Sequence, residues 1–180
     1  MLSERDAPII AVATPPGKGA VGIVRISGKD LRVFANTLCG QSLEPRRAYL
    51  TPIRDEQGQT VDQVLALFFP APHSYTGEDV LELQGHGGPV VLSMLVEYCL
   101  AFANRHNIGL AGLRLAQPGE FTQRAYLNQK MDLAQAEAVS DVIDAQTHAA
   151  VRGAGRSLVG AFSKQVEQLQ EQLLRVRMLV

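Results

Sequence analysis

Proline is confined to one part of this chain, and that distribution limits the fold strongly. All nine prolines lie between Pro8 and Pro118, and thirteen of the sixteen glycines lie at or before Gly119. Proline lacks a backbone N–H and glycine favours turns, so a segment rich in both is built of short elements rather than long helices. We therefore predict an α+β domain with a mixed sheet over residues 1–118. The first helices of an all-α domain follow over residues 119–180.

Short apolar runs bounded by turn residues indicate the strands. Asp55-Glu56-Gln57-Gly58 separates two such runs and is a hairpin signal. In Asp79 to Gln84, Glu82 falls on the face opposite Leu81 and Leu83. The predicted strands cover residues 9–14, 22–27, 48–53, 61–69 and 79–84.

Apolar residues at helical spacing indicate the helices. The helix over residues 90–104 opens at Pro89, is apolar nearly all round, and is expected to be buried. Another helix covers residues 30–39 and ends at Gly40. The remaining predicted helices cover residues 120–127, 132–147 and the stretch from about 149 to the end of the chain.

The last predicted helix carries an apolar stripe whose members are three or four residues apart. Such a stripe is typical of helix-on-helix packing. It reaches the end of the chain without a C-cap signal, so we interpret the chain as part of a longer protein and expect the stripe to be partly uncovered. The stripe consists of Leu158, Phe162, Val166, Leu169, Leu173, Val176 and Val180.

Charge and cysteine content exclude several classes of protein. Lys plus Arg is 17 and Asp plus Glu is 18, whereas a self-sufficient nucleic-acid binder is usually clearly basic. No apolar run reaches the ~18 residues that cross a membrane, and the polar start is no secretory signal. Cys39 and Cys99 form no CxxC motif, which argues against a disulfide scaffold or a cysteine zinc site. We expect a cytoplasmic protein without a membrane partner.

Two glycine-rich segments are candidate ligand-binding motifs. The segment from Gly17 to Gly22 satisfies G-x-G-x-x-G, but it leads into a β-branched strand rather than a helix, so it is not a dinucleotide site. It is either a flexible connection or a loop that approaches a ligand or another subunit. No G-x-x-x-x-G-K-[ST] motif occurs, so this chain has no nucleotide phosphate loop.

The second segment, Gly85-His86-Gly87-Gly88, is interpreted as a turn at the N-terminus of the helix that Pro89 opens. Free N–H groups at such a place bind anions or polar ligand edges. For His86 we favour a structural hydrogen bond over catalysis, because no G-x-S-x-G partner exists. The histidines have no metal-ligand spacing, so no metal site is expected.

Three charged residues stand out. Arg25 and Glu82 interrupt apolar strands, and each could lie on a solvated face, pair with the other across the sheet, or project into a shared cavity. Lys130 precedes a predicted helix and would by itself be a surface lysine.

Three long blocks of the sequence resemble the MnmE (TrmE) family of tRNA-modification GTPases. They are residues 13–28, residues 76–89 and residues 118–128, the last followed by Lys130, Asp132-Leu133 and residues 135–138. The blocks occur in the family's order and cover most of the chain. The departures are small: Ala20 stands where the family commonly has Gly, and Tyr75 and Tyr126 stand for Phe.

The resemblance implies an N-terminal folate-binding and dimerising domain, similar to that of the glycine-cleavage aminomethyltransferase, and then a helical domain. A GTPase domain that uses GTP, magnesium and potassium is inserted in that helical domain, beyond the residues present here. With the flavoprotein MnmG (GidA), the family adds an aminomethyl-type group to C5 of the wobble uridine of tRNA. The implied one-carbon donor is a tetrahydrofolate derivative, in its 5-formyl or 5,10-methylene form.

The resemblance also implies a folate site formed by Arg25, Glu82 and Lys130, with backbone contacts possible at Gly85, Gly87 and Gly88, and no catalytic residue. A carboxylate accepts the adjacent N–H groups of a reduced pterin, and cations suit the carboxylates of the folate tail or polar oxygens of the ring. The division of roles between Arg25 and Lys130 stays open, as does the subunit from which Lys130 reaches the site. Two alternatives are a stand-alone folate-dependent one-carbon transferase and a purely structural dimerisation module.

Overall fold

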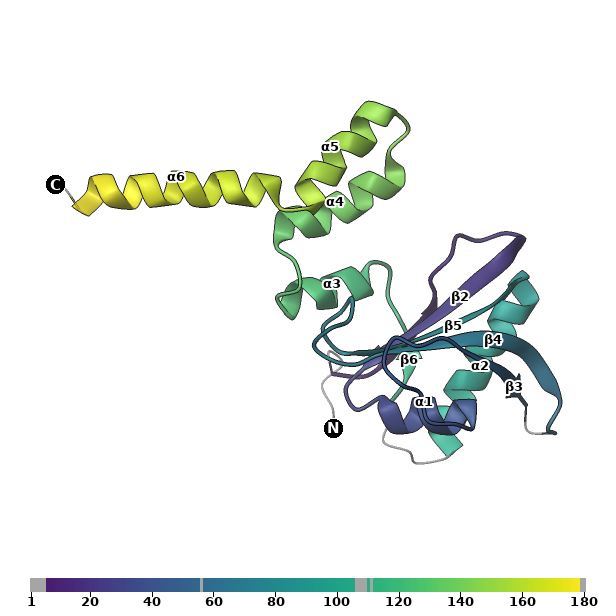
Figure 1. Cartoon of the computed structure of the whole chain (residues 1–180). Coiled ribbons are helices and arrows are strands. Elements are labelled where there is room, and N and C mark those ends of the chain that lie inside the picture. Colours follow the sequence, from purple (N-terminus) through teal and green to yellow (C-terminus); the bar gives the residue numbers. More distant parts are fainter. Residues whose placement is uncertain (1–5, 56, 106–109, 111, 179–180) are drawn as a thin grey trace. The chain divides into compact units, whose positions relative to one another are not determined.

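The computed structural model describes residues 6–55, 57–105, 110 and 112–178. The chain divides into two compact units, Met1–Phe121 and Thr122–Val180 (Figure 1). Each unit is described by itself below.

A mixed sheet forms the centre of the first unit. Its strands are ordered β3-β4-β5-β2-β1-β6, and neighbours are antiparallel except for β1 and β6, which are parallel. This arrangement confirms the predicted mixed-sheet α+β class. The strands are β1 (Ile9–Val12), β2 (Gly19–Gly28), β3 (Tyr49–Arg54), β4 (Thr60–Phe69), β5 (Asp79–Gly87) and the short β6 (Arg114–Leu115), which the sequence pattern did not predict.

Helices α1 (Arg32–Cys39) and α2 (Pro89–Arg105) cover one face of this sheet (Figure 1). Alternate residues of the strands, such as Val24 on β2 and Leu83 on β5, are fully buried beneath them. The rings of Phe34 on α1 and Phe102 on α2 meet edge to face with their centroids 5.7 Å apart. The core therefore lies between the two helices and a single face of the sheet.

The two helices begin and end largely as predicted. Gly40 adopts φ of 64° and ends α1, which only glycine does without strain. Helix α2 begins at Pro89. The prediction that α2 is buried all round is wrong, because Val90 and Met94 are 71% and 45% exposed. Only the α2 face that meets the sheet is covered, so apolar composition overstated the burial of this helix.

Most residues of both glycine-rich segments lie in strands, so the predicted loop over residues 17–22 and the predicted turn over residues 85–88 are largely wrong. Strand β2 already begins at Gly19, and β5 continues to Gly87, which pairs with Gly19. A Cβ atom at Gly87 would stand 2.6 Å from the carbonyl oxygen of Gly19 and 2.7 Å from that of Val21. The two strands thus approach closely beside an irregularity in the β2 register, and glycine is required there.

The second unit is helical. Its helices are α3 (Glu120–Leu127, which begins in the first unit), α4 (Leu133–Asp144), α5 (His148–Leu158) and α6 (Ala161–Met178). Asp132 caps α4: its carboxylate accepts from Gln135 N, and the Gln135 side chain accepts from Asp132 N. The single helix predicted from residue 149 is wrong, because Gly160, with φ of 77°, separates α5 from α6.

Helix α6 extends away from the paired α4 and α5 (Figure 1). The stripe members on α6 are largely exposed, in line with the prediction that the stripe is partly uncovered: Phe162, Leu169 and Leu173 are 57%, 56% and 62% exposed. Leu158, the first member, lies at the end of α5. Val180 lies outside the described residues. Within the described ranges, no helix combines the length and the apolar character needed to cross a membrane.

Candidate functional site

Arg25 and Glu82 face each other across two central strands. Arg25 on β2 is the direct register partner of Glu82 on β5. Their neighbours along each strand point into the core, since Val24, Ile26, Leu81 and Leu83 are all fully buried. Because side chains alternate along a strand, Arg25 and Glu82 project from the sheet face opposite α1 and α2.

The two side chains form a partly buried ion pair. Arg25 Nε donates to Glu82 Oε1 at 2.9 Å, and Arg25 Nη2 lies 2.8 Å from the same oxygen. The side chains are 25% and 14% exposed. Of the readings that the sequence left open, the structure thus shows the pair across the sheet. Among the described residues, Oε2 of Glu82 accepts no hydrogen bond, so one carboxylate oxygen stays available to a ligand.

Two aromatic rings contact the Arg25 guanidinium. Its Cζ lies 5.4 Å from the ring centroid of Tyr75 and 5.7 Å from that of Phe121, both within cation–π range. Tyr75 comes from the loop between β4 and β5, and Phe121 from the first turn of α3. Sequence reasoning gave neither ring a role. The only signal was their position in or beside the blocks that resemble the MnmE family.

The loop that carries Tyr75 is anchored by buried polar groups. Ser27, fully buried on β2, donates through Oγ to Glu78 Oε2 at 2.8 Å and lies 2.7 Å from Thr76 Oγ1. Asp79 Oδ1 accepts from the backbone of Ala71 at the other end of the loop. These bonds hold the loop over β2, and with it the ring of Tyr75.

The sheet face around Glu82 is mixed in polarity. Leu67 on β4 is the register partner of Glu82, and Leu65 is the partner of Gln84, the next residue on the same face of β5. Leu65 is 42% exposed and Leu67 is half-buried. Glu82 therefore lies between the charged side chain of Arg25 on β2 and the apolar side chain of Leu67 on β4.

Lys130 belongs to the second unit, in the connection between α3 and α4. Its backbone N–H donates to Ala125 O at 2.8 Å, and its side chain is exposed. The structure therefore brings Arg25 and Glu82 together within the first unit, and describes Lys130 within the second.

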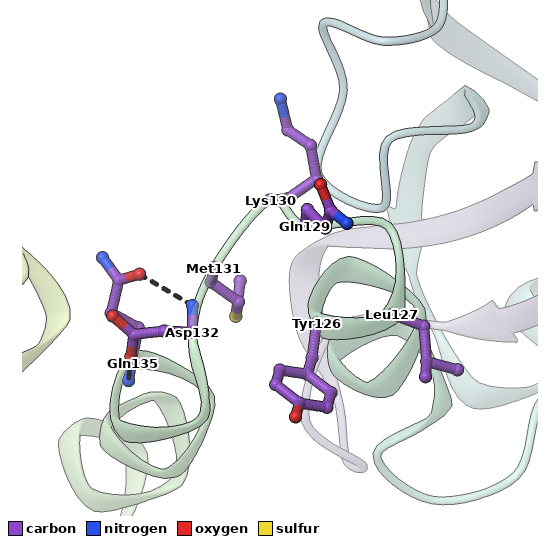
Figure 2. A pocket seen from close by; sticks show the side chains of 7 residues that line it. All are labelled: Tyr126, Leu127, Gln129, Lys130, Met131, Asp132 and Gln135. Atoms are coloured by element: carbon purple, nitrogen blue, oxygen red, sulfur yellow. Dashed lines mark hydrogen bonds between the residues drawn. The ribbon is translucent and has the colours of Figure 1, made fainter.

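Lys130 is one of the residues that line an open pocket of about 560 Å³. Figure 2 shows the Lys130 side chain directed away from those of Asp132 and Gln135, which lie on the α4 side. The pocket is lined by Tyr126, Leu127, Gln129, Lys130, Met131, Asp132 and Gln135.

His86 is held by a buried carboxylate. Asp62, 7% exposed, lies 2.7 Å from His86 Nδ1 through Oδ1 and accepts from His86 N at 2.8 Å through Oδ2. Burial raises the pKa of Asp62, but hydrogen bonds from His86 and Gln63 outweigh it and leave that pKa below its ordinary value. The contact agrees with the structural role favoured for His86.

The glycines named as possible ligand contacts differ in the space beside them. A Cβ at Gly85 would collide with Asp62 Oδ2, and one at Gly87 with the backbone of β2. Gly88 has only an ordinary contact, 3.6 Å from Val91 Cγ2. The space beside the Cα atoms of Gly85 and Gly87 is therefore occupied by other atoms of the protein, namely Asp62 Oδ2 and the β2 backbone.

Neither metal ligation nor thiol chemistry is suggested by the described part of the chain. Its His, Cys, Asp and Glu side chains form no group of three or more that could hold a metal ion. Cys39 and Cys99 are free and buried, and burial raises the pKa of each thiol to about 12. A thiol with so high a pKa is a poor nucleophile at neutral pH.

Comparison with known families matches both units. Residues 8–130 match the model described as "GTP-binding protein TrmE N-terminus", and residues 133–180 match the "MnmE helical domain".

Curated relatives agree over the whole chain. The tRNA modification GTPase MnmE of Acidovorax sp. (strain JS42) is 59% identical over 180 residues, which is 100% of this chain and 38% of that protein. The protein of the same name from Methylibium petroleiphilum is 57% identical over 185 residues, with 100% of this chain and 39% of that protein covered. The chain thus spans less than two fifths of the length of these relatives. On the match to residues 8–130 and these identities, the chain belongs to the MnmE (TrmE) family.

Proposed function

We propose that this chain supplies the folate-binding and dimerising part of a GTPase that modifies tRNA. Support comes from the relatives, which are named tRNA modification GTPase MnmE. In this proposal the complete protein works in the cytoplasm with the flavoprotein MnmG and adds an aminomethyl-type group to C5 of the wobble uridine. GTP, magnesium and potassium bind in a GTPase domain outside the residues present here. This chain, which has no phosphate-loop motif, does not hydrolyse GTP.

The proposed folate site comprises Arg25, Glu82 and Lys130. The observation that carries it is the half-buried Glu82 carboxylate, of which one oxygen accepts no hydrogen bond from the described residues, on a sheet face of mixed polarity. A reduced pterin presents an N–H and an amino group side by side, and a carboxylate is the natural acceptor for such an edge. Residues 1–118 form the ligand-binding part and residues 119–180 begin the helical part in this proposal.

Calorimetry with 5-formyltetrahydrofolate tests the site. Glu82→Gln keeps the size of the side chain and removes its charge, so we expect affinity to fall about 10- to 100-fold, the worth of a charge-assisted hydrogen bond. Glu97→Gln on the exposed face of α2 is the matched control, and its affinity should equal that of the wild type. Equal binding by wild type and Glu82→Gln would contradict the role of Glu82. No binding by wild type would contradict the folate proposal itself.

Dimerisation through the first unit is a separate part of the proposal. Sedimentation at micromolar protein should show a homodimer. A profile containing only monomer would contradict it and leave the folate measurement unaffected.

A further inference from the structure

We infer that the capping box of α4 is also a clasp that fixes the direction in which α6 leaves the α4–α5 pair. The clasp comprises Asp132 and Gln135, and it holds the end of α5 and Ser163 in the first turn of α6. All of these residues belong to the second unit, and the inference does not depend on the proposed folate site. Because α6 carries most of the apolar stripe, the clasp also sets where that stripe points.

Asp132 uses one carboxylate oxygen for α4 and the other for α6. Its Oδ1 accepts from Gln135 N at 2.8 Å, which caps α4, and its Oδ2 accepts from Ser163 Oγ at 2.5 Å. A serine or threonine at this N-cap position would have to use its single side-chain oxygen for both bonds. The second oxygen of aspartate therefore joins α4 to α6, beyond the capping that several residue types provide.

Gln135 divides its side-chain amide in the same way. Its Oε1 accepts from Asp132 N at 2.9 Å and completes the capping box (Figure 2), while its Nε2 donates to Leu158 O at 3.0 Å. Leu158 is the last residue of α5, and carbonyl groups at a helix end lack a partner within their own helix. Glutamate, the other common residue at this position of a capping box, has no N–H group to donate. The amide of glutamine therefore joins α4 to α5.

Helix α6 has little else to fix its direction. All its residues are exposed except Ser163, which is half-buried. Among the described side chains of α6, only that of Ser163 forms a hydrogen bond or ion pair outside the helix. The junction with α5 contains Gly160, whose φ is 77°. Because glycine permits many backbone conformations, the junction by itself does not hold α6 at one angle, and the clasp supplies that restraint.

Distances between spin labels test the clasp in this chain. Labels on Asp141→Cys and Gln170→Cys report the distance from α4 to α6. Labels on Asp141→Cys and Arg152→Cys report the distance from α4 to α5 as the reference. These three positions are exposed, whereas Cys39 and Cys99 are buried, so the labels attach to the introduced cysteines. Dilution with unlabelled protein ensures that each distance joins two labels of one chain.

The main variant combines Asp132→Ser with Gln135→Glu. The resulting Ser-x-x-Glu box caps α4 without a second carboxylate oxygen for α6 or an amide donor for α5. We expect one narrow distribution of α4–α6 distances in the wild type and a roughly twofold wider one in the double variant, because only the glycine junction then restrains α6. The α4–α5 distance and the helix content by circular dichroism should stay unchanged.

Ser163→Ala removes the contact with α6 from the other side and leaves the capping box intact, so it should also widen the α4–α6 distribution. Ser157→Ala at the end of α5 is the matched control. The Ser157 side chain has no partner among the described residues, and this variant should give the wild-type distribution.

Three results would overturn the inference. One is a double variant with the wild-type α4–α6 distribution, and another is a wild type already as broad as the double variant. The third is a changed α4–α5 distance in the double variant, because the box would then hold the α4–α5 pair rather than α6. If the double variant does not fold, Ser163→Ala decides the question, and a distribution equal to that of Ser157→Ala would overturn the clasp.

Discussion

Replacing Gly87 by alanine should destabilise the first unit, whereas the same change at the adjacent Gly88 should not. The added methyl at Gly87 would lie 2.6 and 2.7 Å from the carbonyl oxygens of Gly19 and Val21. These atoms belong to the backbone of β2, so no side chain can rotate away and the β2–β5 pair must separate. At Gly88 the nearest atom is a side-chain methyl at 3.6 Å, an ordinary contact.

The change in the free energy of unfolding is the difference between a steric cost in the folded state and an entropic gain from the unfolded state. Overpacking against backbone costs about 3 kcal/mol, the upper part of the usual range. Alanine also lowers the conformational entropy of the unfolded chain, which raises the free energy of unfolding by about 0.5 to 1 kcal/mol in both variants. Gly87→Ala should therefore lower the free energy of unfolding by about 2 kcal/mol, and Gly88→Ala should leave it equal or slightly higher. At about 4 °C per kcal/mol, Tm falls by about 8 °C for Gly87→Ala alone.

Circular dichroism melts and urea titrations of both variants and the wild type measure these differences. Because the two glycines are adjacent in one motif, a general sensitivity of the segment would affect both variants alike. Equal stability of the two variants would refute the argument from close approach at Gly87.

Further predictions concern Asp62 and the cysteines. The pKa of Asp62 is lower in the folded than in the unfolded state, so its stabilisation is fully present above about pH 4 and is lost as pH falls through the folded pKa. Asp62→Asn should therefore destabilise the protein at pH 7, and the difference from wild type should shrink towards pH 3 in urea titrations. A difference constant from pH 7 to pH 3 would contradict this. Cys39 and Cys99, with pKa values of about 12, should react with a disulfide reagent at pH 8 at least tenfold more slowly in the folded protein than in denaturant. One thiol reacting at the unfolded rate would show that its burial is transient.

Most elements could be predicted from local patterns. Gly40 and Pro89 mark helix boundaries through backbone preferences that operate without tertiary contacts, and both appear where the sequence places them. The strand over 61–69 and its hairpin partner follow from periodicity and turn residues. The predicted strand ends were wrong at the glycine-rich segments. Glycine often ends a strand, but at Gly87 it lets β5 pair closely with β2, so the strand continues.

The sequence by itself determined the mixed α+β class, the helical continuation and the family, because these depend on residue order and spacing. It also singled out Arg25 and Glu82 as unusual charges on apolar strands. Only the tertiary structure decided that they pair, that Oε1 takes both contacts, and that Tyr75 and Phe121 adjoin Arg25. These contacts join residues 50 or more positions apart in the chain, Arg25 and Tyr75 being the nearest of the three pairs. Sheet register and loop anchoring set those distances, and no local pattern encodes them.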